Sequence, residues 1–390
     1  MKVALVHYWL VGMRGGEKVL EAMCDLYPEA DIFTLVCDTA AISDKLRRHR
    51  ITTSFLQKLG GVRHYQKMLP LMPYALESFD LTSYDLIISN EAGPAKGIIP
   101  GPGATHICYC NSPMRYIWDL YYQYRAASGP LTRAVMSLTA PSLRQWDVTT
   151  SHRVDHFIAN SFYVAQRIER YYRRSSQVVH PPVNLPQFEV AAQPGDYYLC
   201  AGQITPYKKI ELAVQACTAL GRRLVVIGGG ASPALRRMAG PTVEFLGAVD
   251  QPTMVRHFAH CRALLYPGVE DFGIVPLEAM ASGRPVIAFG KGGALDTVVD
   301  GSTGLFFHAQ SVDGLVAAIE RFEALPDGTF RPEVLQAHAR TFDTSIFKAR
   351  LAEVIQQLLA GNERPAPRAP GRALQIAATN ADAVRTARAA

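Results

Sequence analysis

The chain has 390 residues, of which 48% are hydrophobic and 19% charged, and its net charge is +6 at pH 7. This length exceeds what one hydrophobic core usually supports, so we expect two domains with a cleft between them. No stretch approaches the roughly 20 apolar residues that span a bilayer, so any membrane contact is expected to be peripheral.

The first half of the chain repeats a pattern of apolar strand, loop and helix. The apolar run at the amino terminus has no signal-peptide cleavage site and is interpreted as a first strand. Gly15 and Gly16 then form a flexible turn ahead of a helix with apolar residues at helical spacing. Strands are predicted over 2–8, 85–90, 105–110 and 155–161, and helices over 17–27 and 162–172. The pattern predicts an open α/β sheet.

A proline-rich stretch over 178–188 interrupts this pattern and is typical of a linker between domains. Beyond it the alternation restarts, which predicts a second doubly wound domain. Strands are predicted over 197–202, 223–230, 243–247, 263–268 and 285–289, and helices over 210–220 and from Pro276 onward.

We therefore divide the chain into three parts. The first domain covers residues 1–180 and the second covers 181–360, with its last helix packing back on the first domain. Residues 361–390 are rich in Ala, Pro and Arg without steady periodicity, and are predicted to be disordered or weakly helical.

The cysteines indicate a reducing compartment. Their number is odd, most lie in apolar runs, and they lack the spacing of a zinc site. They are Cys24, Cys37, Cys108, Cys110, Cys200, Cys217 and Cys261. Reduced core thiols are the better interpretation, which favours the cytoplasm.

The most informative segment follows the strand predicted over 263–268. Glu270 lies in the loop after this strand, and a helix is expected to begin near Pro276 with Glu278 in its first turn. Ligands of parallel α/β sheets bind beyond the carboxyl ends of the strands, so both carboxylates can face one ligand. Carboxylates accept hydrogen bonds from vicinal hydroxyl groups, which suits ribose and hexose rings. Taken alone, however, Glu278 could simply cap the helix and Glu270 could be a solvated loop residue.

Here the sequence resembles glycosyltransferase family 4, the retaining transferases of the GT-B fold. The family signature is a Glu, seven residues and a second Glu around an FG-containing loop, which Glu270, Phe272, Gly273 and Glu278 match in place. The resemblance extends over about the first 360 residues. Further matching segments are Gly15 and Gly16, 106–119 (HICYCNSPMRYIWD), 159–161 (ANS), 202–209 (GQITPYKK) and 292–304.

The resemblance implies a fold and a role for each matching residue. The fold would be GT-B, with two Rossmann-like domains facing a central cleft. Glu278 would hold the donor ribose, Glu270 the transferred sugar and Lys208 the diphosphate, whose growing charge a lysine stabilises. Further donor contacts would come from Gly15, Gly16, Ser161, Gln203, Lys209, Phe272, Gly273 and Ile274. In isolation, Lys208 would be read as an exposed loop lysine, and the two glycines as an ordinary tight turn.

Two positions depart from the family pattern. An Arg often follows the glycine of the turn at 202–209, and this chain has Gln203, so Lys209 is expected to supply the missing cation. Close relatives carry a histidine that contacts the transferred sugar, and this chain has Asn111 there. In the family the leaving phosphate itself assists the incoming hydroxyl group. The residue at 111 would therefore orient the sugar, and asparagine can still donate and accept hydrogen bonds.

The first half offers residues for an acceptor and a membrane. Arg115, Tyr116 and Trp118 could line an acceptor pocket, since aromatic faces stack on sugars and arginines bind phosphates bidentately. Basic residues over 45–67 precede an apolar run over 68–79, a combination that suits an anionic bilayer. A solvated helix face over a normal core is the alternative for both groups. Nucleic acid is not expected as a partner, because no binding motif is present and the excess charge is small.

The sequence thus predicts a cytoplasmic enzyme at the inner face of the membrane. It would transfer a hexose, mannose from GDP-mannose by overall similarity to mannosyltransferases of the family, onto a lipid-diphosphate-linked saccharide for an exported polysaccharide. No cofactor or metal is expected, because Lys208 and backbone amides would neutralise the diphosphate. The alternatives are an epimerase or phosphorylase on the same fold and a nucleotide-sugar-binding subunit without catalysis. A dehydrogenase is disfavoured because the loop around Gly15 lacks the G-x-G-x-x-G spacing.

Overall fold

The computed structural model describes residues 1–91 and 93–361. Met1–Ala352 form one compact unit, and a second unit begins at Glu353. Apart from Gly361, the tail predicted for 361–390 lies outside the described residues.

The first sheet has seven parallel strands in the order β3-β2-β1-β4-β5-β6-β7. From β1 the sheet extends on one side through β2 to β3, and on the other side from β4 to β7. The strand order therefore reverses between β1 and β4. This reversal opens a crevice at the carboxyl ends of the two strands, where ligands of such sheets bind. The strands are β1 (Val3–His7), β2 (Asp31–Thr34), β3 (Ile51–Thr53), β4 (Leu86–Glu91), β5 (Thr105–Cys110), β6 (His156–Ala159) and β7 (Ser176–Val178).

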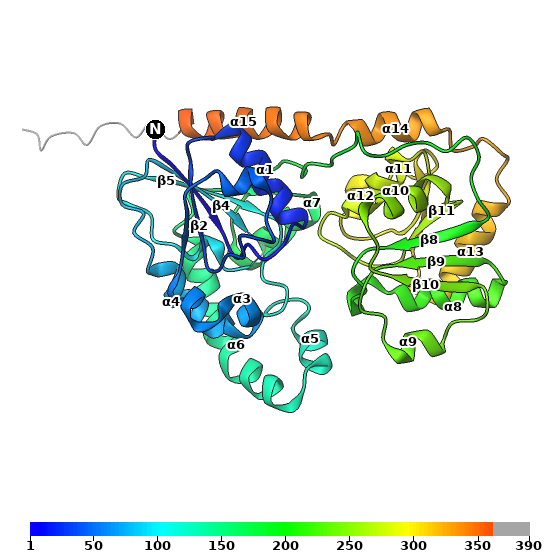
Figure 1. Ribbon diagram of the computed structural model, residues 1–390, viewed down its shortest axis with the longest axis horizontal. Helices are drawn as coiled ribbons and strands as arrows, with labels where there is room; N and C mark the ends of the chain where they lie inside the picture. The colour runs from blue at the N-terminus through cyan, green and yellow to red at the C-terminus, as the bar shows by residue number, and fades with distance from the viewer. Residues whose placement is uncertain (92, 362–390) are drawn as a thin grey trace, which may run out of the picture. The chain divides into compact units, whose positions relative to one another are not determined.

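The second sheet has six strands in the order β10-β9-β8-β11-β12-β13, again all parallel. Its reversal lies between β8 and β11, so the loops after these two strands are neighbours. Figure 1 shows β8, β9, β10 and β11 of this sheet in green to yellow. The strands are β8 (Tyr197–Ala201), β9 (Arg223–Ile227), β10 (Val243–Gly247), β11 (Ala263–Tyr266), β12 (Val286–Phe289) and β13 (Gly304–Phe307).

Helices connect the strands of each sheet and cover its faces, as a parallel sheet requires. Ser161 caps α7 by accepting a hydrogen bond from Val164, and Asp250 caps α10 in the same way. The helices are α1 (Gly15–Leu26), α2 (Asp44–Arg47), α3 (Gly61–His64), α4 (Met72–Glu77), α5 (Tyr121–Ala127), α6 (Pro130–Ser151), α7 (Phe162–Tyr172), α8 (Ile210–Leu220), α9 (Pro233–Arg237), α10 (Gln251–His260), α11 (Ile274–Ala281), α12 (Ala294–Thr297), α13 (Val312–Glu323), α14 (Pro332–Arg340) and α15 (Thr344–Gly361).

Each sheet is buried on both faces. In β8, Tyr198 and Cys200 pack into one apolar cluster while Leu199 and Ala201 pack into the cluster on the opposite face. This division follows from the two-residue period of a strand. It explains why the strands are continuous apolar runs in the sequence, which is the pattern that allowed their prediction.

The structure confirms the predicted strands and helices to within a few residues at their ends. It adds elements that the sequence pattern did not indicate, namely β2, β3, β7, β13 and the long helix α6. One boundary was wrong in a way that matters for the site. Helix α11 begins at Ile274 rather than near Pro276, so Glu278 lies beyond the first turn.

Two contacts before residue 353 show where the start of the last helix lies. Phe347 of α15 meets Tyr109 of β5 edge to face, with ring centroids 5.7 Å apart. Lys348 forms an ion pair with Asp25 of α1 at 3.1 Å. The chain therefore returns from the second sheet to elements of the first. Within the described residues, no helix is both long and apolar enough to cross a membrane.

All seven cysteines are free and buried. Burial raises the pKa of Cys24, Cys217 and Cys261 to about 12, so these thiols stay protonated at physiological pH. The prediction of reduced core thiols is confirmed.

Candidate active site

The loops after β8 and β11 bring together Lys208, which was expected at the donor diphosphate, and Glu270, which was expected at the transferred sugar. Lys208 ends a 3₁₀ turn after β8, and Glu270 lies in the loop after β11. The Lys208 Nζ atom is 3.1 Å from Oε1 of Glu270. Gly268 makes this approach possible, because a Cβ atom there would lie 2.6 Å from the Cα atom of Lys208. The sheet reversal and one glycine therefore create the pair.

Glu278 lies on α11 close to the same lysine. Burial raises the pKa of Glu278 to about 7, although the nearby charge of Lys208 acts in the opposite direction. A carboxyl group with such a pKa exchanges its proton near neutral pH, which is a property of functional sites more often than of structural ones. Lys208 thus influences both carboxylates of the signature.

Gly273 precedes α11 and adopts a left-handed conformation with φ of 88°. A Cβ atom at this position would come 2.4 Å from the hydroxyl oxygen of Tyr266, so only glycine fits. The amides of the first turn of α11, which have no partner within the helix, are the groups that bind anions at helix amino termini.

Gly15 and Gly16 behave differently from the prediction. They are the first two residues of α1, and neither has a positive φ, so the expected flexible turn is wrong. Because the two glycines lack a side chain, neighbouring side chains can approach their backbone closely. A Cβ atom on Gly15 would lie 3.3 Å from Cδ1 of Ile274, and one on Gly16 would lie 3.4 Å from the ring of His7. The start of α1 thus faces the start of α11.

His7 and Glu17 form a buried pair beneath this loop, with Nε2 of His7 3.7 Å from Oε1 of Glu17. Burial alone would raise the pKa of Glu17, but His7 and backbone N–H groups outweigh it and hold the pKa below its usual value. Glu17 also accepts a hydrogen bond from the backbone N–H of Arg14. Glu17 therefore fixes the first turn of α1 rather than facing the cavity.

A row of asparagines crosses the carboxyl ends of β4, β5 and β6. The amide of Asn111 donates to Oδ1 of Asn90 at 2.6 Å, and Asn90 donates to the carbonyl of Gly16 at 2.6 Å. Asn160 donates to the carbonyl of Asn111 at 3.0 Å. Asn111 thus belongs to a chain of neutral hydrogen bonds that ends at the backbone carbonyl of Gly16. Neither Asn90 nor Asn160 was predicted as a site residue, although Asn90 ends a predicted strand and Asn160 belongs to the matching ANS segment.

These groups surround a cavity of about 670 Å³. Of the residues predicted for the site, Gly15, Gly16, Asn111, Arg115, Tyr116, Glu270, Phe272, Gly273 and Ile274 line it. Its walls also include an apolar part formed by Trp9, Leu69, Met72, Tyr124 and Met136. The cavity thus combines polar loop ends with an apolar wall, as sites for small ligands commonly do.

Other predicted residues lie outside the lining. Ser161 is fully buried at the start of α7, and Lys209 pairs with Glu211 at 3.4 Å rather than with Glu270. The side chain of Gln203 lies beside Gly229 and Gly230. Lys208 and Glu278 are not among the residues that line the cavity, and Lys208 contacts the lining residue Glu270.

Trp118 packs inside the first domain. Its indole N–H donates to Asp147 at 2.7 Å, and its ring stacks on Tyr171 with centroids 4.8 Å apart. Asp147 also forms a fully buried ion pair with Lys96. The structure therefore does not bring Trp118 to the cavity with Arg115 and Tyr116.

The apolar run predicted to be exposed over 68–79 is largely part of the core. Met72, Leu76 and Phe79 are buried, whereas Leu71 and Tyr74 are exposed. The alternation follows from the helical turn of α4, which buries one side of the segment.

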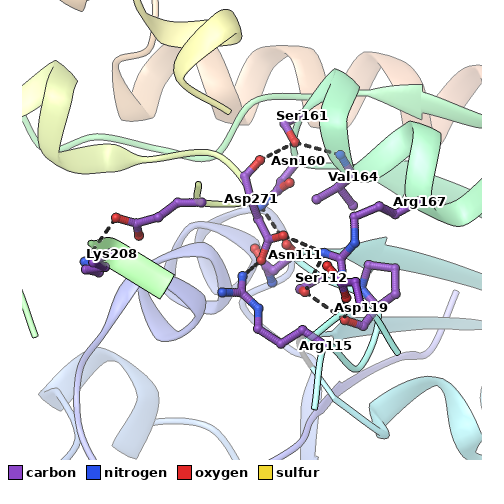
Figure 2. A network of polar contacts seen from close by, with 12 residues as sticks. Asn111, Ser112, Arg115, Asp119, Asn160, Ser161, Val164, Arg167, Lys208 and Asp271 are labelled. Carbon is purple, nitrogen blue, oxygen red and sulfur yellow. Dashed lines mark hydrogen bonds and ion pairs between the residues drawn. The ribbon is translucent and has the colours of Figure 1, made fainter. Parts of the chain in front are cut away.

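A cluster of charges surrounds Asp271, the residue after Glu270 (Figure 2). The Asp271 carboxylate forms ion pairs with Arg115 and Arg167, and its carbonyl oxygen accepts a hydrogen bond of 2.5 Å from Ser161. Arg167 also pairs with Asp119 at 2.7 Å. This cluster was not recognised in the sequence, because Asp271 lies more than 100 residues from Arg115, Ser161 and Arg167.

No cluster of three or more His, Cys, Asp or Glu side chains that could hold a metal ion occurs in residues 1–91 and 93–361.

Part of the chain resembles a known family of proteins. Residues 195–324 match the family described as Glycosyl transferases group 1. The D-inositol 3-phosphate glycosyltransferase of Streptomyces scabiei is 29% identical, and the match covers 54% of this chain and 55% of that protein. The GDP-mannose-dependent alpha-(1-6)-phosphatidylinositol monomannoside mannosyltransferase of Mycobacterium tuberculosis is 33% identical over 40% of this chain and 46% of that protein. The chain spans about half the length of the curated relatives it matches.

Solved structures give the same result for the fold. Sucrose-phosphate synthase of Thermosynechococcus elongatus aligns with a TM-score of 0.69 and 18% identity, covering 93% of this chain and 100% of that chain. HepE of Anabaena, in complex with UDP, aligns with a TM-score of 0.66 and 16% identity over 92% and 100% of the two chains. The predicted GT-B fold with two Rossmann-like sheets and the resemblance to glycosyltransferases are confirmed.

Proposed function

From the match of residues 195–324 to the group 1 glycosyl transferases, we propose that the protein is a retaining glycosyltransferase. The observation that carries the proposal is the placement of Lys208 3.1 Å from Glu270, beside Glu278, at the carboxyl ends of β8 and β11. A positive charge between two carboxylates suits a donor with a diphosphate between two hydroxyl-bearing rings.

Each residue has a defined part in the proposed reaction. Glu278 binds the ribose, Glu270 binds the transferred sugar, and Lys208 stabilises the diphosphate as it leaves. The bond between the anomeric carbon and the phosphate oxygen breaks, and a bond from that carbon to the acceptor oxygen forms on the same face. The acceptor hydroxyl proton passes to a phosphate oxygen. We propose that no metal takes part, so that transfer persists when a chelator is added.

The proposed donor is GDP-mannose. The support comes from the mycobacterial mannosyltransferase, whose name specifies GDP-mannose and whose similarity to this chain reaches 33% identity. Other relatives are glycosyltransferases acting on inositol phosphate or glycogen synthases, so the donor is the part of the proposal that most needs a direct test.

The proposed acceptor is a saccharide linked to a lipid diphosphate. Arg115 and Tyr116 line the cavity and offer a cation and an aromatic face for a phosphate and a sugar. The apolar wall formed by Trp9, Leu69 and Met136 suits an acceptor that carries an apolar part next to its polar one.

An exposed apolar row on α6 supports contact with a membrane. Leu131, Val135 and Leu138 are spaced by four and three residues, so they lie on one face of the helix, and Leu131 and Leu138 are 79% and 81% exposed. Arg133 lies on the same helix, and Tyr122 of the adjoining α5 is also exposed. Arg133 is two residues from Leu131 and therefore faces away from this row, so the support comes from the apolar residues, which suit contact with a bilayer surface. We propose that the protein works at the cytoplasmic face of the membrane.

The proposal is tested by nucleotide-dependent thermal stabilisation. A ligand that binds only the folded protein raises its melting temperature. We expect GDP to stabilise the protein more than UDP, ADP or NAD, and we expect Glu278→Ala to lose the GDP effect. A rise in melting temperature with GDP, but no transfer to any lipid-linked acceptor, would favour the alternative of a nucleotide-sugar-binding subunit without catalysis. The departures from the family pattern at Asn111 and Gln203 are the reason for considering this alternative. An NAD shift would contradict the assignment.

A further inference from the structure

Asp271 lies directly after Glu270 but makes its contacts with different parts of the chain. Glu270 pairs with Lys208 of the second domain. Asp271 pairs with Arg115, from the loop after β5, and with Arg167 of α7. Figure 2 shows Asp271 between these two arginines. Neighbouring residues of the signature loop are thus held by opposite halves of the structure.

The contacts of Asp271 are too complete for a solvated loop residue. One carboxylate oxygen accepts a hydrogen bond from Arg167 at 2.6 Å and the other pairs with Arg115, while the backbone carbonyl accepts one from Ser161. Asp271 is 8% exposed and Arg167 is 5% exposed. Charges buried to this degree are tolerated only when they are paired and hydrogen-bonded, so the loss of one partner strongly destabilises the arrangement.

Arg167 is itself fixed by the segment that carries Asn111. It donates to the Ser112 hydroxyl oxygen at 3.1 Å and to the Pro113 carbonyl at 3.3 Å, and it pairs with Asp119. The guanidinium group therefore joins the loop after β5 to the loop after β11. A planar group with donors along two edges can hold both loops at once, which a lysine could not.

We propose that Asp271 is a positioning residue that sets the place of Glu270 relative to the first domain. The inference rests on the proposed function, because it needs Glu270 to hold the transferred sugar. Arg115 and Arg167 belong to the first domain, which binds the acceptor in the proposed function. By holding Asp271, they determine the position of the neighbouring Glu270 carboxylate. Arg115 has a second part in this arrangement, because it lines the cavity and stacks over Tyr207, with its guanidinium carbon 4.9 Å from the ring centroid. Tyr207 immediately precedes Lys208.

The test uses Asp271→Asn in the full-length protein, with Asp296→Asn as a matched control. Asp296 also joins the two halves, by accepting a hydrogen bond of 2.9 Å from the backbone N–H of Phe162, and its carboxylate lies 3.9 Å from Nδ1 of His180, so both of these partners lie outside the Glu270 loop. We expect Asp271→Asn to lower kcat by about 10- to 100-fold, in the range lost when reacting groups are misplaced. The Kd for GDP should stay within about twofold, because the nucleotide contacts are left in place. Asp296→Asn should leave kcat within about twofold of the wild-type value.

A second comparison separates positioning from a general structural role. In a Glu270→Gln background, Asp271→Asn should add less than about threefold to the loss, because residues that act through one another are not additive. Equal losses in both backgrounds, or a kcat of Asp271→Asn that matches the wild type, would overturn the proposal. So would a loss of similar size in Asp296→Asn.

A binding measurement keeps this outcome distinct from failure of the proposed function. We expect Asp271→Asn to weaken GDP-mannose by about tenfold relative to GDP, because only the sugar reaches Glu270. If the wild-type protein binds no nucleotide-sugar, the proposed function fails. If the wild type binds GDP-mannose and the variant binds it equally well, the function stands and the positioning role of Asp271 is wrong.

Discussion

The two sheets of the protein share a topology but present different chemistry at their reversal points. At the second sheet, the loops after β8 and β11 carry the charged pair of Lys208 and Glu270. At the first sheet, Gly16 of α1, Asn90 of β4 and Asn111 after β5 form a neutral hydrogen-bonded row. The cation beside this row, Arg115, is paired with Asp271 of the loop after β11. The comparison teaches that topology fixes where loops meet, while the residues on those loops decide whether they stabilise charge or shape a surface.

The largest effect is expected where charge is removed from the second sheet. Lys208→Ala should lower kcat by about 100- to 1000-fold, as loss of one preorganised charge-stabilising group does. The measurement is steady-state transfer with saturating donor. Lys209→Ala provides the comparison, since Lys209 pairs with Glu211, and its loss should stay below about tenfold. Equal losses for the two lysines would show that the 3.1 Å contact with Glu270 has no special part.

Glu278→Gln should have opposite effects on the stability of the ligand-free protein and on its binding of GDP. The ligand-free folded protein holds the Glu278 proton up to a pKa of about 7, whereas the unfolded chain loses it near 4.5. Between these values the folded state binds more protons, so this carboxyl group lowers the stability of the fold as pH rises through the window. Glutamine does not titrate.

The melting temperature of Glu278→Gln should therefore exceed that of the wild type by about 2–5 °C at pH 8, and by much less at pH 5. The same variant should lose the stabilisation that GDP gives, since an amide cannot accept two ribose hydroxyls as a carboxylate does. A variant that is less stable than the wild type at pH 8 would show that Glu278 is ionised and well paired in the ligand-free protein.

A smaller effect is expected at Gly15, the first residue of α1. In Gly15→Ala, the new methyl group would lie 3.3 Å from Cδ1 of Ile274, so the end of the Ile274 side chain must move slightly. We expect donor affinity to fall by about fivefold, equivalent to about 1 kcal/mol of overpacking. Gly12→Ala is the matched control, because nothing lies within 4 Å of a Cβ atom there. Calorimetric titration with GDP compares the two, and an unchanged affinity in Gly15→Ala would remove this residue from the site.

The smallest effect is expected for Asn111→His. The imidazole cannot reproduce the 2.6 Å hydrogen bond from the Asn111 amide to Asn90 without moving the row that ends on Gly16. One neutral hydrogen bond is worth about 0.5–1.5 kcal/mol, which corresponds to a change in rate of about 2- to 12-fold. Transfer rates with GDP-mannose and with a second GDP-sugar measure it. An unchanged rate and donor preference would show that the position does not matter.

The sequence predicted the second sheet more completely than the first. Most of its strands are largely apolar runs of four or five residues separated by clear turn residues, and its signature residues lie within one segment around Glu270. In the first sheet, β2 and β3 are short and include polar residues such as Asp31 and Thr52, so their apolar pattern is weak. Helix α6 has few buried residues and hence little helical periodicity.

The site shows the same limit. Glu270, Glu278 and Lys208 follow predicted strands and could be placed at a sheet edge from the sequence. Asp271 and Arg167 could not, because their pairing depends on how loops of two sheets meet, which no local pattern records. The conformation of Gly15 was predicted wrongly for a related reason, since the need for a glycine there comes from Ile274, far away in the sequence.

The central claim is tested most directly by following labelled mannose from GDP-mannose into a lipid-linked saccharide fraction. The wild-type protein should transfer the label with retained anomeric configuration, and Glu270→Gln should reduce transfer by about 100-fold or more. Nucleotide binding by both proteins without transfer from GDP-, UDP- or ADP-sugars to any acceptor would contradict the account and make the chain a nucleotide-sugar-binding subunit.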